Sequence, residues 1–343
     1  MHIRTRIARS FGCLLACAMM LGVGACGAQT VKPVQDAQGA TMYPVKINEA
    51  FQSLLYLPLY VAKDKGIFAK HGIVIDGAIG NSGTGGAALT TVLRGDAGFA
   101  LGGPENVAYM NARGGKTVSV STAANSAPTW IVSRDGTPLK SVADLKGHSV
   151  SVSAPGTTTN TLLKEGLKAA GMTYGKDVRV HEVQQGSEIS TVVTGRTQYA
   201  IANEPYISQS LEKGLRIVYS WTSVYPEYAY STFMTSRAFV EKNPQVVQRF
   251  VASINDALHY IHGDRQGSIA VARAWFPALQ PSVLSDAVQR MIDSNVYPES
   301  ALITPQAMRT AMQRQINAGN LKAMPEYTNV VNPLFATRAE SKS

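Results

Sequence analysis

Cysteine is almost absent from this chain of 343 residues. The only three are Cys13, Cys17 and Cys26, all close to the N-terminus. The rest of the chain therefore has no disulfide framework, no thiolate metal site and no cysteine nucleophile. Charged residues are few, at 16%, and apolar residues make up 45%, which is typical of a globular protein. The length fits two domains of ordinary size.

Long apolar runs and basic blocks are also missing. No stretch beyond the N-terminal region is long enough to cross a membrane. The net charge of +9 is spread along the chain, so it gives no support to nucleic-acid binding. His259 and His262 have a spacing seen in metal sites, but no carboxylate or cysteine completes the set. We predict no nucleic-acid partner, no metal and no cofactor.

The N-terminus has the pattern of an export signal. Arg4, Arg6 and Arg9 precede an apolar run over residues 11–23, which is too short for a mature membrane helix. Small residues then lead to Cys26, as in the lipobox of bacterial lipoproteins, which this segment resembles. The resemblance implies a signal peptide over residues 1–25, lipidation of Cys26 and attachment to a membrane. The alternative is an ordinary secretory leader that is cut nearby.

Alternating strand and helix patterns begin at Tyr43 and predict an α/β fold with mainly parallel sheets. Before them, residues 26–42 are polar and predict a flexible tether. After about residue 236 the pattern is helical, so we expect a helical C-terminal part. We expect a tail over residues 331–343, of which the polar residues 336–343 are frayed.

Two segments about a hundred residues apart resemble each other. Residues 91–95 match residues 191–195, and residues 99–101 match residues 199–201, each time as the end of a helix followed by a strand. The repeat predicts two similar α/β lobes. Ligands of open parallel sheets lie beyond the carboxyl ends of the strands, so we expect a cleft where the two lobes face each other.

Hydroxyl side chains gather over residues 153–160, where a strand pattern gives way to a helix. The first turn of a helix has backbone N–H groups without partners and a partial positive charge. Hydroxyls beside these donors form a cup that can hold an anion or a polar ring edge. The alternative is that Thr157 or Thr158 only caps its own helix.

Six loops at the expected strand ends are rich in Gly, Ser, Thr, Asn and Gln. They supply the predicted ligand-binding residues, which are Gln52, Ser53, Tyr56, Ser82, Gly83, Thr84, Gly103, Asn106, Gly156, Thr157, Thr158, Thr159, Gly186, Ser187, Asn203 and Glu204. No Arg or Lys lies in these loops. Glu105 and Glu204 lie near the starts of predicted helices, where an acidic side chain interacts favourably with the helix dipole. The alternative is that they face the cleft, where they would favour a ligand with N–H donors or a positive charge. The sequence therefore leaves two classes of ligand, a small organic anion and a heterocycle.

Four motifs in order carry a family resemblance: residues 58–73, residues 142–147 with the loop 155–158, residues 176–178 and residues 203–205. They are similar to segments of the ABC-transporter solute-binding proteins for nitrate, sulfonates, taurine and thiamine-pyrimidine precursors. The resemblance implies a type II periplasmic-binding-protein fold. In such a fold the chain crosses twice between lobes, and we place these crossings near Thr129 and Tyr228.

The resemblance also implies a domain division and a function. The first lobe would comprise 43–128 plus 229–330, and the second lobe would comprise 129–228. The chain would be an exported, monomeric protein without catalytic residues, and would pass a small polar solute to an inner-membrane permease with a cytoplasmic ATPase. The alternatives are a ligand-sensing lipoprotein and a biosynthetic enzyme on the same fold.

Overall fold

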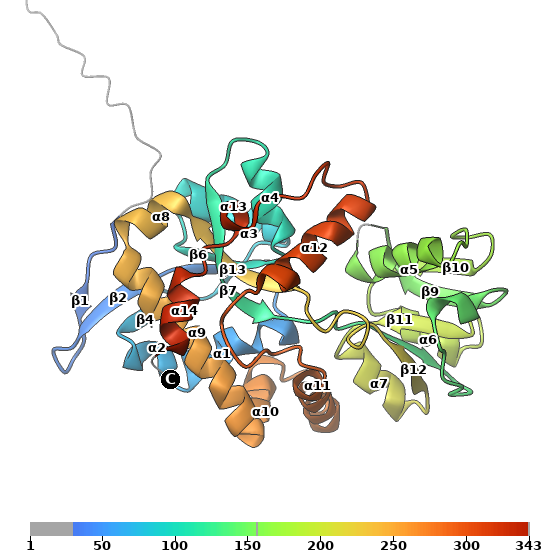
Figure 1. The fold of residues 1–343 in the computed structure, drawn as a ribbon. Coiled ribbons are helices and arrows are strands. Elements are labelled where there is room, and N and C mark those ends of the chain that lie inside the picture. Colours follow the sequence, from blue (N-terminus) through green and yellow to red (C-terminus); the bar gives the residue numbers. More distant parts are fainter. Residues whose placement is uncertain (1–29, 156, 342–343) are drawn as a thin grey trace, which may run out of the picture.

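The computed structural model describes residues 30–155 and 157–341. The predicted signal peptide, Cys26 and Gly156 lie outside the described residues. The described chain forms a larger and a smaller lobe, each built around its own sheet, with the C-terminal helices on the larger one (Figure 1).

The sheet of the larger lobe has five strands in the order β5-β3-β6-β13-β7. β3 pairs in parallel with β5 and β6, whereas β13 is antiparallel to both β6 and β7. The strands are β3 (Ile47–Glu49), β5 (Gly80–Asn81), β6 (Phe99–Gly102), β7 (Thr117–Ala124) and β13 (Ser231–Ser236).

The sheet of the smaller lobe repeats this plan in the order β10-β9-β11-β8-β12. Its first three strands are parallel, and β8 is antiparallel to β11 and β12. Four of the five strands in each sheet therefore run in the same direction, and the fourth strand in each order, which follows a crossing from the other lobe, runs opposite to them. The prediction of mainly parallel sheets is confirmed. The strands are β8 (Trp130–Ser133), β9 (Ser149–Ser153), β10 (Arg179–Val183), β11 (Tyr199–Ala202) and β12 (Arg216–Ser220).

The repeat in the sequence maps onto this shared plan. The matching segments are the end of α3 with β6 in one lobe, and the end of α6 with β11 in the other. Both helices end at a glycine in the left-handed region, Gly95 at φ 83° and Gly195 at φ 74°. The prediction of two similar lobes is confirmed.

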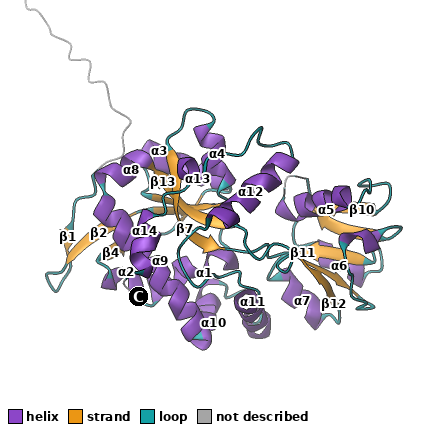
Figure 2. Ribbon diagram, in the orientation of Figure 1, coloured by secondary structure: helices purple, strands orange, loops and turns teal. Residues whose placement is uncertain are grey.

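Helices cover the faces of both sheets and form most of the C-terminal part (Figure 2). Those up to residue 220 are η1 (Leu54–Tyr56), α1 (Leu57–Asp64), α2 (Ile67–Lys70), α3 (Gly85–Arg94), α4 (Glu105–Asn111), η2 (Val142–Leu145), α5 (Thr158–Ala169), α6 (Glu188–Val193) and α7 (Tyr206–Glu212). Those that follow are α8 (Arg237–Lys242), α9 (Pro244–Gly263), α10 (Arg265–Trp275), α11 (Pro281–Asp293), α12 (Pro305–Asn317), α13 (Tyr327–Val330) and α14 (Leu334–Glu340).

The second half of the predicted tether is part of the fold. β1 (Val34–Gln35) is antiparallel to β2 (Thr41–Val45), and β2 pairs in parallel with β4 (Ile73–Ile75). The backbone N–H of Val31 also donates to Asn243 Oδ1 at 2.7 Å. The prediction of a flexible tether up to residue 42 is therefore wrong, because backbone pairing holds a stretch whose side chains are mostly polar.

The predicted frayed tail is a helix that packs on the larger lobe. α14 lies against α9 and buries Phe335, which is 3% exposed. Gln248 Nε2 of α9 donates to the carbonyl oxygen of Phe335 at 3.0 Å. Phe335 and Ala339 lie four residues apart on one helical face, and this short apolar stripe orders the segment.

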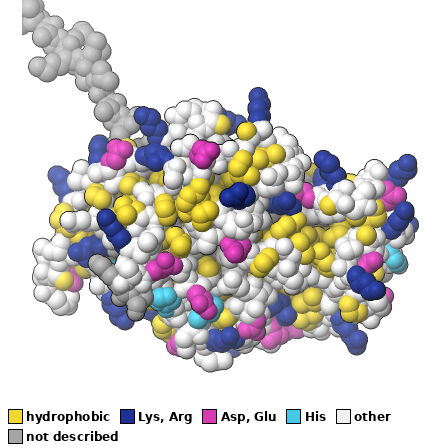
Figure 3. Space-filling model, viewed as in Figure 1, with side chains coloured by type: hydrophobic (Ala, Val, Ile, Leu, Met, Phe, Trp, Pro, Cys, Tyr) yellow, Lys and Arg dark blue, Asp and Glu magenta, His cyan; other side chains and the backbone are white. Residues whose placement is uncertain are grey.

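The chain passes between the lobes twice, from β7 to β8 and from β12 to β13. The two crossings are joined where Trp221 N–H donates to Thr129 O at 3.0 Å, and the Trp221 side chain is buried. The proposed boundaries near Thr129 and Tyr228 fall in these segments. Within the described ranges, no helix has the length and hydropathy needed to span a bilayer. Lys and Arg side chains are dispersed over the face in Figure 3, with Asp and Glu among them.

Aromatic stacking in the larger lobe gives a test of its core. The Phe250 ring of α9 stacks on Phe99 with centroids 3.8 Å apart, and it also contacts Phe68 and Phe233. We expect Phe250→Ala to lower the free energy of unfolding by about 3–5 kcal/mol, because it leaves a cavity. Chemical denaturation measures this change. The control Leu334→Ala, at a side chain that is 46% exposed, should change it by less than about 0.5 kcal/mol; equal losses would contradict this assignment of the core.

Candidate functional site

The first predicted loop of the larger lobe, at Gln52 and Ser53, is hydrogen-bonded to residues of α1 and α10. β3 ends at Glu49, which is 3% exposed and accepts a hydrogen bond from the Tyr60 hydroxyl at 2.8 Å. The Tyr60 oxygen also accepts from the Ser53 N–H at 3.2 Å. Burial raises the pKa of Glu49 to about 7, against the opposing effect of the Tyr60 hydrogen bond. Gln52 is exposed, and its Nε2 donates to Trp275 O at 2.6 Å.

The second and third predicted loops of this lobe, residues 82–86 and 103–106, contact each other. Asn106 Nδ2 donates to Gly103 O at 2.9 Å, and a Cβ at Gly85 would lie 2.6 Å from the same Nδ2. Asn106 therefore joins the two loops. Residues 82–84 lie at or near the surface of the lobe, where Thr84 caps α3 through its side chain. Tyr56, which precedes α1, is buried at 2% exposure.

The hydroxyl-rich stretch of the smaller lobe divides into two roles. Thr157 Oγ1 accepts the Asn160 N–H at 3.3 Å and lies 3.1 Å from Thr159 Oγ1, so Thr157 caps α5 and Thr159 is buried beside it. The helix-capping alternative therefore holds for Thr157. Thr158 makes no such cap, and its side chain interacts with the hydroxyl of Tyr230 in the second crossing.

The other two loops of the smaller lobe also lie close together. A Cβ at Gly186 would lie 2.9 Å from the Tyr206 ring, and Ser187 is exposed at the start of α6. Asn203 Oδ1 accepts a hydrogen bond from the Thr129 hydroxyl at 2.9 Å, and Asn203 also interacts with the Tyr230 hydroxyl. Asn203 thus contacts both crossings between the lobes.

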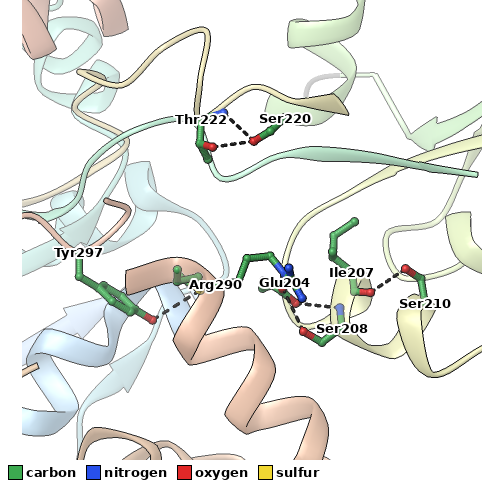
Figure 4. Close-up of polar contacts among 9 residues, drawn as sticks. Glu204, Ile207, Ser208, Ser210, Ser220, Thr222, Arg290 and Tyr297 are labelled. Carbon is green, nitrogen blue, oxygen red and sulfur yellow. Dashed lines mark hydrogen bonds and ion pairs between the residues drawn. The ribbon is translucent and has the colours of Figure 1, made fainter. Parts of the chain in front are cut away.

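Glu204 joins the two lobes. Its side chain is 2% exposed, and Arg290 of α11 donates from Nε to Glu204 Oε1 at 2.7 Å (Figure 4). Ser208 donates to the same carboxylate from its backbone N–H at 3.0 Å and from its hydroxyl at 3.1 Å. Burial raises the pKa of Glu204, whereas Ser208 and Arg290 lower it. This carboxylate is fully engaged and is not offered to a ligand.

A cavity of about 390 Å³ lies between the lobes, within the usual size range of small-molecule sites. Helices of both lobes, the second crossing and the C-terminal helix α12 all contribute to its lining. The lining residues are Glu105, Tyr109, Arg113, Thr158, Thr161, Leu162, Tyr228, Arg314, Gln315 and Asn320. Of the predicted ligand-binding residues, Thr158 is on this lining, and Gly103 and Asn106 flank Glu105.

Glu105 is the acidic group of the cavity. It is the first residue of α4, a position where its charge also interacts favourably with the helix dipole, and it is half-buried. A Cβ at Gly103 would lie 2.2 Å from Glu105 Oε1, so glycine at position 103 leaves the space that the carboxylate fills. Burial raises the pKa of Glu105, and burial together with the Glu105 charge raises the pKa of Tyr109 to about 12.

Sequence reasoning missed the contribution of α12. Arg314 donates from Nη1 to the Tyr225 hydroxyl, and the same nitrogen lies 3.4 Å from Glu165 Oε2 on α5. α12 thus bridges to the smaller lobe from a distant part of the sequence, where no loop or glycine pattern marks a site. In the parts of the chain that the structure describes, no group of three or more His, Cys, Asp or Glu residues is placed to hold a metal ion.

Comparison with known proteins identifies the family. The family model described as NMT1/THI5 like matches residues 55–267, more than half of the chain. The chain belongs to this family. A binding protein of Bacillus subtilis strain 168, YtlA, is 23% identical over 337 residues, which are 97% of each chain. Most residues of this NMT1/THI5-like protein therefore align with a single relative of the same length.

Solved structures share the fold. The aliphatic sulphonate binding protein SsuA of Escherichia coli has a TM-score of 0.67 at 19% identity, over 84% of this chain and 92% of its own. The nitrate-binding protein NrtA of Synechocystis PCC 6803 has a TM-score of 0.64 at 15% identity, over 87% and 88%. The desulfurization enzyme DSZB has a TM-score of 0.63 at 16% identity, over 87% and 99%. The predicted family and two-lobed α/β fold are confirmed.

The buried carboxyl of Glu49 gives a pH test of the first loop. Its pKa rises from 4.5 to about 7 on folding, so between these values the folded protein holds a proton that the unfolded chain has released. Stability should therefore fall as the pH rises through this window, by up to about 1.4 kcal/mol per pH unit. Glu49→Gln should remove this slope when the free energy of unfolding is measured from pH 4.5 to pH 7. If the free energies of unfolding of the two proteins change with pH in the same way, the raised pKa of Glu49 is refuted.

Proposed function

We propose that this protein is the exported solute-binding component of an ABC importer. It captures a small polar solute between its two lobes and delivers it to an inner-membrane permease that works with a cytoplasmic ATPase. The observation that carries the proposal is the cavity between the lobes, whose walls come from α4, α5, α12 and the second crossing. The sulphonate- and nitrate-binding relatives, which share the fold, support a transport role.

We propose a binding protein and not an enzyme, although DSZB is an enzyme with a similar fold. A crystal structure of a DSZB mutant in complex with biphenyl-2-sulfinic acid is a further neighbour. In the present chain no cysteine follows Cys26, so all three lie in the proposed export and anchoring segment. The described lining residues include hydroxyls, carboxamides and charged groups but no Cys, Ser or His, so they hold no Ser–His or Cys–His nucleophile pair.

A direct test is native mass spectrometry of the exported protein from its own host. A solute bound without a covalent bond should add a uniform mass that is lost on unfolding, and its return should raise the melting temperature. Chemical conversion of that solute by the purified protein would overturn the proposal in favour of an enzyme.

Two substitutions test where the solute lies. We expect Thr158→Ala and Asn203→Ala each to weaken binding of the retained solute by about three- to tenfold, because each removes one hydrogen-bonding group beside Tyr230. Calorimetry measures the affinities, and circular dichroism shows that the variants fold. The control Thr137→Ala, at an exposed position of the smaller lobe, should leave affinity unchanged. Unchanged affinity in both test variants would rule out this placement of the cleft.

We also propose that Cys26 is lipidated and anchors the protein at the periplasmic face of a bacterial membrane, and that the chain acts as a monomer. The small residues before Cys26 support the anchor. One chain provides both walls of the cavity, so no second copy is needed to complete it.

Fractionation of the host tests the anchor. Cys26→Ser should move the protein from the membrane fraction to the soluble exported fraction, since no acyl chain would hold it. Cys17→Ser, within the proposed signal peptide, is the control and should leave the protein with the membranes. Continued membrane attachment of Cys26→Ser would exclude lipidation at this position.

A further inference from the structure

The charge inside the cavity differs from what an anion carrier requires. Glu105 lines the cavity, and within the described residues no Lys, Arg or His nitrogen lies within 4.0 Å of its carboxylate. Its pKa is raised by burial, and only a hydrogen bond from its own backbone N–H opposes that rise. A half-buried carboxyl group without a cationic partner is a favourable site for a positive group, because a cation stabilises its ionised form, and that ionised form repels an anion.

The two arginines of the lining do not offset this charge. Arg314 is engaged with Glu165 and Tyr225, and its guanidinium also lies over the Tyr225 ring at 4.8 Å from the centroid. Arg113 is exposed at the end of α4, where solvent screens its charge. Among the charged groups of the described lining, Glu105 is thus the one that is partly buried and has no ion-pair partner.

Tyrosine rings line the same cavity as this carboxylate. Tyr109 and Tyr228 line the cavity, and Tyr230 lies next to Tyr228 with ring centroids 5.5 Å apart and planes at 83°. Burial raises the pKa values of all three phenols, with a smaller contribution from the Glu105 charge. Tyrosine rings and a carboxylate in one cavity suit an ammonium group, because a cation is attracted to the ring faces and to the negative charge.

We propose that the cavity binds a small organic cation, such as an amine or ammonium compound, with its charged nitrogen at Glu105 between the rings of Tyr109 and Tyr228. This inference rests on the proposed function and specifies the class of solute. It separates this protein from relatives that are named for sulfonate or nitrate. Gly103 belongs to the site because any side chain there would displace the Glu105 carboxylate.

A binding panel tests the proposal on the full exported chain. Primary amines, amidines and choline are compared with neutral isosteres, among them 3,3-dimethylbutanol for choline, and with methanesulfonate and nitrate. Thermal shift gives the first screen and calorimetry the affinities. We expect at least one cation to bind, while its neutral isostere binds at least tenfold more weakly and the two anions do not bind.

Variants then locate the charge. Glu105→Gln keeps the shape of the side chain and should weaken binding of the cation by about 10- to 100-fold, and Gly103→Ala should weaken it through displacement of the carboxylate. The matched control is Glu241→Gln at an exposed position on α8, which should leave affinity unchanged. Circular dichroism and melting curves confirm that each variant is folded, so a loss of binding is not a loss of structure.

The outcomes separate this inference from the proposed function. Reversible binding of methanesulfonate or nitrate, with an affinity that Glu105→Gln does not lower, overturns the cation proposal and leaves the solute-binding function in place. Equal binding of a cation to the wild type and to Glu105→Gln also overturns it, as does the absence of a shift with every cation. Chemical turnover of a probe would instead remove the proposed function itself.

Discussion

The ion pair between Glu204 and Arg290 fixes how the two lobes meet. The Glu204 side chain is almost fully withdrawn from water, and the Arg290 Nε approaches it to 2.7 Å from a helix of the other lobe. Taking both charges out of water costs about as much as their attraction returns, so the pair adds little net stability. A buried charge without its partner is far less favourable, and the pair therefore strongly disfavours other placements of α11 against α7.

The cavity depends on that placement. With α11 held against the smaller lobe, α12 also crosses toward α5, and its Arg314 lies beside Glu165. The space left between α4, α5 and α12 is the cavity. The second crossing also reaches the cavity, so Tyr228 contributes a ring without belonging to a helix or strand of either wall.

The sequence predicted well what depends on local pattern. The strand and helix alternation, the repeat around Gly95 and Gly195 and the helix start near Thr157 each depend on neighbours within a few residues, and the structure has all three. It predicted poorly what depends on distant partners. Residues 34–42 are mostly polar, so the sequence predicts a tether there and gives no sign that residues 34–35 pair with 41–42. The apolar stripe of α14 is short, so the sequence predicts a tail in place of this helix.

The candidate site shows the same division. The helix start at Thr158 was predicted, because hydroxyls after a strand are a local signal. The sequence leaves Glu105 with two roles, and only the tertiary structure places it on the cavity lining with its carboxylate beside Gly103. The α12 residues could not be predicted, since α12 reads as an ordinary amphipathic helix and reaches the cavity only through tertiary packing.

The Glu204–Arg290 ion pair lies apart from the cavity lining, whereas Arg314 both lines the cavity and contacts the smaller lobe. Glu204 and Arg290 are absent from the lining, and Glu105 and the tyrosines take no part in the ion pair. The Glu204–Arg290 pair thus acts on the fraction of molecules with the lobes together, while Glu105 acts on the intrinsic affinity of the cavity. The observed affinity is the product of that fraction and that intrinsic affinity. Substitutions on α4 can therefore alter which solute is accepted without altering how readily the lobes close, and substitutions at position 290 can scale the affinity for every solute alike.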